Sequence, residues 1–125
     1  MVNKAYSTEV AHEYGHGLNV WYGTGNGANG IGEAVADVWA MFVFETPCVF
    51  ACAGGEPCND FCIRSGLSTV RYCGDEHPSC YEDLHQTGQA LMGALWKVRR
   101  NLVNSLGPSE GALTTDLLFL DWLNG

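Results

Sequence analysis

The chain has 125 residues, a length that allows one domain, and 46% of them are apolar, enough to bury a core. Fourteen acidic against six basic side chains give a net charge of −8, which argues against a nucleic-acid partner because phosphate binding needs a basic surface. The longest apolar run, residues 38–44, is far too short to span a bilayer. These properties leave a single domain, and they are compatible with secretion.

The first predicted helix covers residues 7–22 and carries the sequence HEYGH, a motif of the form HExxH. Residues four apart share one face of a helix, so His12 and His16 can hold one metal ion from the same side. Glu13 is displaced around the axis, where its carboxylate can reach a water at the metal without being a ligand. The alternative is a chance HExxH on a surface helix, because the pattern is short.

Two glycines, Gly15 and Gly17, weaken this helix, and a glycine so close to a metal site could let another element approach. The loop that follows, residues 23–32, contains a GxGxxG pattern at 25–30. A dinucleotide-binding fingerprint must follow a strand, whereas this one follows a helix. The loop is therefore interpreted as a flexible connector.

A second helix is predicted from about residue 30 to residue 46, because Pro47 disfavours helix in the residue before it. Catalytic zinc takes three protein ligands and one water, and Glu33 can be the third ligand. Asp37 lies four residues later and can accept the N–H from the far side of a zinc-bound imidazole. Their neighbours are mostly apolar, so these carboxylates need a partner; a solvated face of an ordinary helix is the alternative.

Residues 47–82 are predicted to form a cysteine-rich insertion, which contains all six cysteines of the chain. An even number of cysteines in a loop-rich segment predicts three disulfides, with about fifteen possible pairings. A second, structural zinc is the alternative, although the Cys-x-x-x-Cys spacing is not the usual one for a zinc ribbon. The cysteines are Cys48, Cys52, Cys58, Cys62, Cys73 and Cys80.

A third helix is predicted from about Leu84 to about Leu106, where Gly107-Pro108 ends it, and a fourth over residues 111–123. The fourth helix is expected to close a helical bundle. The third has apolar residues at spacings of three and four, which predict its core-facing side. These residues are Leu91, Leu95, Val98, Leu102 and Leu106.

The sequence HEYGHGLN at residues 12–19, followed by GIGEAVADVWA at residues 30–40, resembles the gluzincin metallopeptidases, the thermolysin-like and fungalysin-like families. The resemblance covers residues 5–45 and, more loosely, residues 83–105. There His85 is similar to a substrate-facing histidine, which would donate a hydrogen bond to the oxyanion. Asp83 is near His85, but two residues is an awkward spacing for orienting its ring.

This resemblance implies a mainly α fold like the C-terminal half of a gluzincin catalytic domain, with zinc as cofactor. It implies a secreted or extracellular enzyme that hydrolyses bonds in peptide or protein substrates, with Glu13 as the base. In these families a β-rich lobe precedes the motif helix, so residues 1–125 are expected to be a partial catalytic domain. Without that upstream lobe, the isolated chain is expected to be weakly active and prone to associate.

The rival hypothesis is a non-catalytic secreted module that binds zinc structurally or binds a protein partner through its cysteine-rich loop. Glu13 discriminates between the two, because a structural site closed by four ligands needs no adjacent base.

Overall fold

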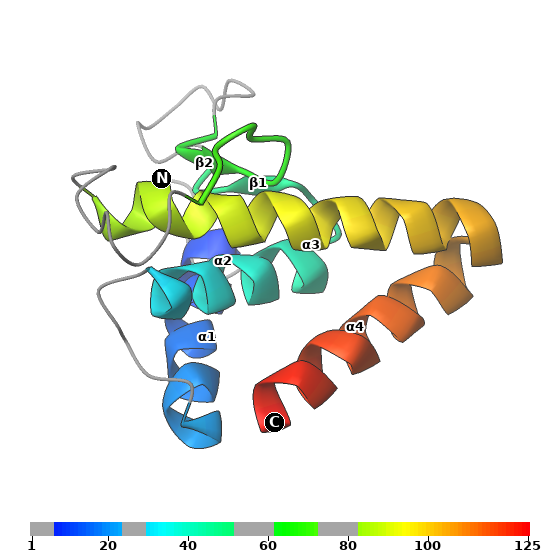
Figure 1. Cartoon of the computed structure of the whole chain (residues 1–125), viewed down its shortest axis with the longest axis horizontal. Helices are drawn as coiled ribbons and strands as arrows, with labels where there is room; N and C mark the ends of the chain where they lie inside the picture. The colour runs from blue at the N-terminus through cyan, green and yellow to red at the C-terminus, as the bar shows by residue number, and fades with distance from the viewer. Residues whose placement is uncertain (1–6, 24–29, 52–61, 73–82) are drawn as a thin grey trace.

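A computed structural model of the protein describes residues 7–23, 30–51, 62–72 and 83–125 (Figure 1). Its helices are α1 (Thr8–Tyr22), α2 (Ile31–Val43), α3 (Leu84–Leu106) and α4 (Pro108–Asn124). Two short strands, β1 (Cys48–Val49) and β2 (Arg64–Ser65), lie between α2 and α3 in sequence. Helices take up 73% of the described residues, which confirms the prediction of a mainly α-helical chain. No helix in the described ranges has both the length and the apolarity to cross a membrane.

The first two helices form close to where the sequence predicts them. α1 ends at Tyr22, and the left-handed backbone of its C-cap Gly23 (φ 69°) lets the Gly23 N–H bond to the carbonyl oxygens of Asn19 and Val20. α2 ends at Val43, earlier than predicted, because Glu45 adopts a positive φ of 50° that a helix cannot contain. The chain therefore turns away from the helix before Pro47 is reached.

The boundary between α3 and α4 is sharper than predicted. α3 ends at Leu106, as expected, and its C-cap Gly107 has a φ of 93°. The next helix begins at once with Pro108, three residues before the predicted start at residue 111. Proline suits the first position of a helix because its fixed φ is helical and no N–H is needed there. Gly107-Pro108 thus ends one helix and starts the next, giving the α3–α4 hairpin in Figure 1.

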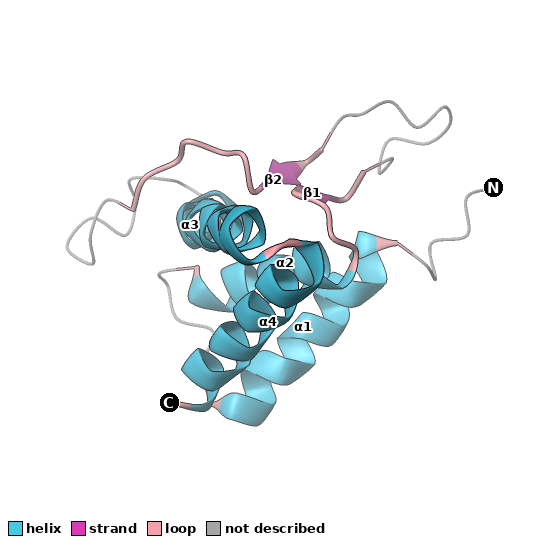
Figure 2. Cartoon of the chain, turned by 90° about the vertical axis from the view of Figure 1, so that its right-hand side faces the viewer, coloured by secondary structure: helices cyan, strands magenta, loops and turns pink. Residues whose placement is uncertain are grey.

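The helices pack around α2, which contacts α1 on one side and α3 on another, while α3 also packs on α4 (Figure 2). Nine of the thirteen residues of α2 are buried, so its nearly continuous apolar sequence is the centre of the core. A Cβ on Gly15 of α1 would lie 2.6 Å from the Cα of Ala36, so this glycine allows the backbones of α1 and α2 to approach closely. Gly17 has no such neighbour within 4 Å.

The predicted core stripe of α3 is wrong in part. Val98 and Leu106 are exposed, whereas Met92, Trp96 and Arg99 are buried on the side that faces the core. The difference has a packing cause: Gly88 comes against the backbone of α2 and Gly93 against that of Ser68, so the glycine side of α3 is the side that approaches its neighbours. Apolar periodicity alone did not reveal this choice of face.

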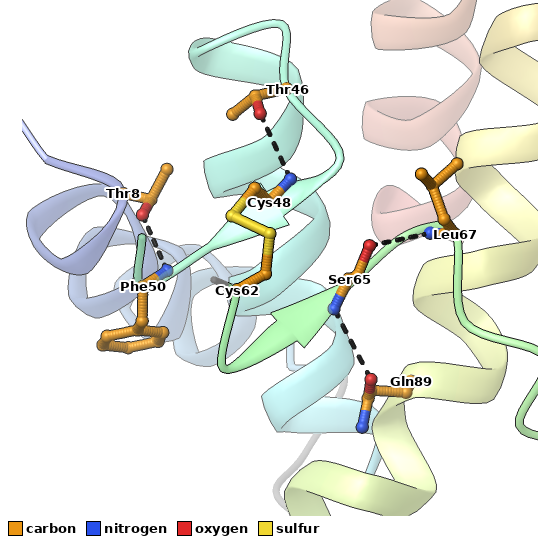
Figure 3. The surroundings of a disulfide bond; sticks show 8 residues. All are labelled: Thr8, Thr46, Cys48, Phe50, Cys62, Ser65, Leu67 and Gln89. Carbon is orange, nitrogen blue, oxygen red and sulfur yellow. Dashed lines mark hydrogen bonds between the residues drawn. A yellow bond between two sulfur atoms is a disulfide. The ribbon is translucent and has the colours of Figure 1, made fainter. Parts of the chain in front are cut away.

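The two strands form an unpredicted antiparallel ribbon in which Cys48 pairs with Ser65 and Val49 with Arg64. A disulfide between Cys48 and Cys62 joins the two sides of the ribbon (Figure 3). This bond is one of the expected disulfides of the insertion. The other four cysteines, Cys52, Cys58, Cys73 and Cys80, lie outside the described residues.

Candidate metal centre

The two histidines of the HExxH motif lie side by side on the face of α1 that meets α2. The Nε2 atoms of His12 and His16 are 3.1 Å apart, with ring planes nearly perpendicular at 84°. His12 is buried, and His16 is partly exposed. The one-turn spacing thus brings one nitrogen of each ring to the same point.

Glu33 supplies an oxygen at that point from the first turn of α2. Its Oε2 lies 3.5 Å from His12 Nε2 and 3.6 Å from His16 Nε2. The three atoms therefore form a nearly equilateral triangle. Tetrahedral zinc with bonds of about 2.0–2.1 Å holds neighbouring ligand atoms about 3.4 Å apart. The triangle has the size of one face of such a tetrahedron, and these three residues are the candidate metal-binding group of the described chain.

Asp37 lies on the far side of His12 from this triangle, where its Oδ1 is 2.7 Å from His12 Nδ1. Because the carboxylate accepts the Nδ1–H, the lone pair of Nε2 is left facing Glu33 and His16. Burial by itself would raise the pKa of Asp37, but hydrogen bonds from His12 and Arg64, together with the charge of Arg64, hold its pKa below the ordinary value. The carboxylate is therefore kept ionised within the core.

Arg64 is the part of the site that sequence reasoning missed. From strand β2 its Nε donates to Asp37 Oδ2 at 2.6 Å, and a terminal nitrogen donates to Oδ1 at 2.9 Å. Its guanidinium lies 4.7 Å from the centre of the Phe50 ring. The sequence does indicate that a buried carboxylate needs a partner, but a hydrogen bond from His12 meets that need without Arg64. A carboxylate has two oxygens, and here they serve a histidine and an arginine together.

His85, at the start of α3, faces the same centre. Its Nε2 lies 3.0 Å from Glu33 Oε2, and its Nδ1 lies 2.7 Å from Asp83 Oδ1. The expectation that Asp83 is awkwardly spaced to orient this ring is wrong. Asp83 is the N-cap of α3, with extended backbone, and its side chain also accepts the N–H of His85. Those two bonds, backbone first and side chain second, lower the pKa of Asp83.

Glu13 follows His12 on α1 and is exposed. It lines a surface pocket of about 570 Å³ with Tyr14, Gly17 and other residues of the same helix. About 100° of rotation separates neighbouring residues of a helix, so Glu13 lies beside the face that carries the two histidines. Its side chain is open to solvent, as a base that exchanges protons requires.

The residues present fit a zinc ion. Glu33 Oε2 is buried and, among the described residues, has no partner in hydrogen-bonding geometry, although three imidazole nitrogens lie within 3.6 Å. The Nε2 atoms of His12 and His16 lie near this oxygen without bonding to it, the arrangement expected of atoms that share a ligand, whereas His85 forms an ion pair with it at 3.0 Å. Two imidazoles and a carboxylate are the donor set of catalytic zinc sites with a free position.

A larger pocket, of about 640 Å³, lies apart from this centre between the N-terminal ends of α2 and α3. Its lining is mostly apolar, and none of the candidate ligands contributes to it. The pocket with the greater volume is therefore not the one that contains the candidate metal ligands.

Comparison of the chain with protein-family models, curated proteins and solved structures finds no match. The geometry of the centre is accordingly the main support for a function.

Proposed function

We propose that the protein binds one zinc ion through His12, His16 and Glu33 and is a gluzincin-like metallopeptidase. The observation that carries the proposal is the triangle of ligand atoms, with sides of 3.1, 3.5 and 3.6 Å. Two helices meet to form it, and a buried aspartate fixes the outer nitrogen of one ligand. An accidental motif on a surface helix would have no reason to face a carboxylate from a second helix.

The chemistry follows from what surrounds the triangle. Zinc bound there would act as a Lewis acid that polarises a carbonyl and lowers the pKa of a water. Glu13 would take the proton of the attacking water and pass it to the leaving amine. His85, oriented by Asp83, presents Nε2 beside Glu33, from where it would donate a hydrogen bond to the oxyanion. The expected fold is like that of the C-terminal half of a gluzincin catalytic domain.

The Cys48–Cys62 disulfide is compatible with an extracellular location, since disulfides persist mainly in oxidising compartments. Positioning of the substrate is worth several kcal/mol of the barrier, so the rate of cleavage would depend on how the peptide is held beside the site.

The metal is tested by elemental analysis of the purified protein and of Glu33→Ala. The parent should hold one zinc per chain and the variant far less, since a ligand is lost. Glu110→Ala is the matched control, because Glu110 is an exposed glutamate in the first turn of α4. A parent without zinc, or a Glu33→Ala variant with full zinc content, would exclude this site.

Catalysis is tested with an unstructured protein substrate and zinc-loaded protein. Chelator-sensitive cleavage by the parent, lost in Glu13→Gln, supports the peptidase; Glu13→Gln should keep its zinc, because Glu13 is not a ligand. Zinc binding with no cleavage by either protein would favour the non-catalytic module.

A further inference from the structure

The disulfide lies next to the residue that holds the buried aspartate of the metal centre. Cys62 precedes Arg64 by two residues, and Cys48 precedes Val49, which pairs with Arg64 across the ribbon. Each strand has only two residues, and so short a ladder is not stable by itself. The disulfide, drawn in Figure 3, is therefore the covalent link between the two sides of the ribbon that carries Arg64.

Two sets of contacts connect the ribbon to His12, one through Arg64 and one through Phe50. Through Arg64 it binds both oxygens of Asp37, at 2.6 and 2.9 Å, and Asp37 in turn holds His12 Nδ1 at 2.7 Å. Phe50, which follows β1, places its ring 5.1 Å from the His12 ring and 4.7 Å from the Arg64 guanidinium. Its backbone N–H donates to Thr8 Oγ1 at 2.9 Å, which ties the ribbon to the start of α1.

We propose that the Cys48–Cys62 disulfide positions the metal centre through Arg64, so that reduction of this bond loosens His12 and weakens metal binding. A dithiol reductant would break the S–S bond, transfer two electrons and two protons to the two sulfurs, and itself become a disulfide. Arg64 then loses its fixed register, and Asp37 loses two of the three hydrogen bonds that set the direction of its carboxylate. Its hold on the outer nitrogen of His12 is relaxed as a result.

The physical basis is the cost of ordering a long side chain. An arginine loses much rotamer freedom when it is fixed in one geometry, and a bidentate pair to a carboxylate requires both planes to align. A ribbon closed by a covalent bond supplies that alignment before the pair forms. Partners that orient a ligand histidine typically change metal affinity about 10–100-fold, and we expect the same range here.

The proposal is tested first without metal, by long-range ¹H–¹⁵N NMR of the histidine rings at about pH 8, well above the ordinary pKa of histidine. In the parent, His12 should show one fixed tautomer with its proton on Nδ1. In Cys48→Ser/Cys62→Ser, and in the dithiol-treated parent, the two tautomers of His12 should average. Arg64→Lys should give an intermediate result, because a lysine can hold only one oxygen of Asp37 well.

Arg99→Lys is the matched control for Arg64→Lys. Arg99 is also a buried arginine at 4.7 Å from a phenylalanine ring, but its polar partners among the described residues, Glu45, Ala112 and Asp116, are outside the candidate metal centre. It should leave the His12 signal unchanged. A double cysteine variant with normal helical circular dichroism and a fixed His12 tautomer would overturn the proposal. If helical content is lost and a protecting osmolyte does not restore it, the disulfide acts on the whole fold and the proposal also fails.

The second arm measures zinc affinity by competition with a chromophoric chelator, and this arm rests on the proposed function. The double cysteine variant should bind zinc about 10–100-fold more weakly than the parent, with Arg99→Lys unchanged. A parent that binds no zinc would refute the proposed function, while the NMR result would still decide the role of the disulfide. Equal zinc affinity of the parent and the double variant would refute the proposed coupling alone.

Discussion

Two buried arginines, at two ends of the helical core, make nearly the same set of contacts. Arg64 lies 4.7 Å from the ring of Phe50 and binds Asp37; Arg99 lies 4.7 Å from the ring of Phe42 and binds Asp116. Arg99 also contacts the carbonyl oxygen of Ala112 at 3.4 Å. Both therefore join elements that are distant in sequence.

The carboxylates differ, and the difference separates a cluster beside the candidate metal centre from one that only joins helices. Asp37 is fully buried and also holds a histidine of the metal centre, whereas the side chain of Asp116 is 43% exposed. A buried ion pair is weak evidence for stability, because desolvation offsets much of the attraction. The Arg64 cluster is thus best explained by what it orients, and the Arg99 cluster by the α2–α3–α4 packing that it joins.

The largest expected effect comes from removing the two aspartates in turn. Asp37→Ala should lower the free energy of unfolding by about 3–5 kcal/mol, because it leaves a buried guanidinium unpaired. Asp116→Ala should cost about 1.5 kcal/mol, since its carboxylate is partly solvated and other acceptors of Arg99 remain. Urea denaturation with matching slopes measures both. Equal losses would remove the distinction between the clusters.

Adding a methyl group at a glycine that lies against a neighbouring helix backbone tests the same difference between the Arg64 and Arg99 clusters. Gly15→Ala would place a Cβ 2.6 Å from the Cα of Ala36, and Gly111→Ala would place one 2.4 Å from the Cα of Val103. Both are backbone contacts, so each variant should lose about 1–3 kcal/mol. Only Gly15→Ala should also lose zinc affinity, because α1 and α2 carry the proposed ligands.

The control for the glycine pair is Gly17→Ala, whose Cβ would meet nothing within 4 Å. It should gain about 0.5–1 kcal/mol from the helix preference of alanine. Thermal melting and the zinc competition assay measure the set; loss of zinc affinity in Gly111→Ala would contradict the assignment of that glycine to the structural end.

Lowering the pH of the metal-free protein should reduce the stability that ionised Asp37 contributes to the folded state. Its pKa is lowered on folding, so it contributes stability that is present above the unfolded-state value of about 3.9 and is lost as pH falls through the folded-state pKa. The groups facing it are His12 from α1 and Arg64 from β2.

The difference in unfolding free energy between the parent and Asp37→Asn should therefore narrow as pH drops below about 4, by an amount measurable in urea titrations. Asp116→Asn, whose parent carboxyl is partly solvated, is the comparison. A parent–variant difference that stays constant down to about pH 2 would mean that folding does not lower the pKa of Asp37.

The smallest effect on stability should come from the exposed apolar side chains. Trp21 on α1 is 83% exposed, and Leu117 on α4 is also exposed. Trp21→Ser and Leu117→Ser should each change the free energy of unfolding by less than about 0.5 kcal/mol. Both should reduce self-association in sedimentation velocity, because apolar contact area is removed. A parent that stays monomeric at high concentration would contradict the expected association.

Local signals predicted the helices well. The HExxH spacing, the apolar run of α2 and the Gly107-Pro108 pair place α1, α2 and α3 within a few residues of their observed bounds. The start of α4 was missed because proline can either end or begin a helix. The buried face of α3 was missed because close contacts at two glycines, not apolar spacing, decide which side of that helix meets its neighbours.

Only the part of the site that depends on a single helix turn could be predicted from the sequence. The spacing of His12 and His16 follows from the helix period, but the distance from Glu33 to either ring depends on how α1 packs on α2. Arg64 lies 27 residues beyond Asp37, in a segment with no periodic pattern, so only the folded chain shows the pairing. The Asp83–His85 contact was misjudged because an N-cap side chain turns back over the first helical turn.

The four side chains around the candidate centre differ in exposure, so one side of the centre is more open to solvent than the other. Side-chain exposure rises from 4% at His12 to 21% at Glu33, 27% at His16 and 41% at His85. Asp37 and Arg64 cover the candidate centre on the side of His12. Anything that arrives from solvent, whether a cation, a chelator or the carbonyl of a peptide, reaches the His85 and His16 side first. If the proposed metal binds, its exchange rate should therefore depend on the mobility of these two rings, even where the binding strength depends on the buried side chains.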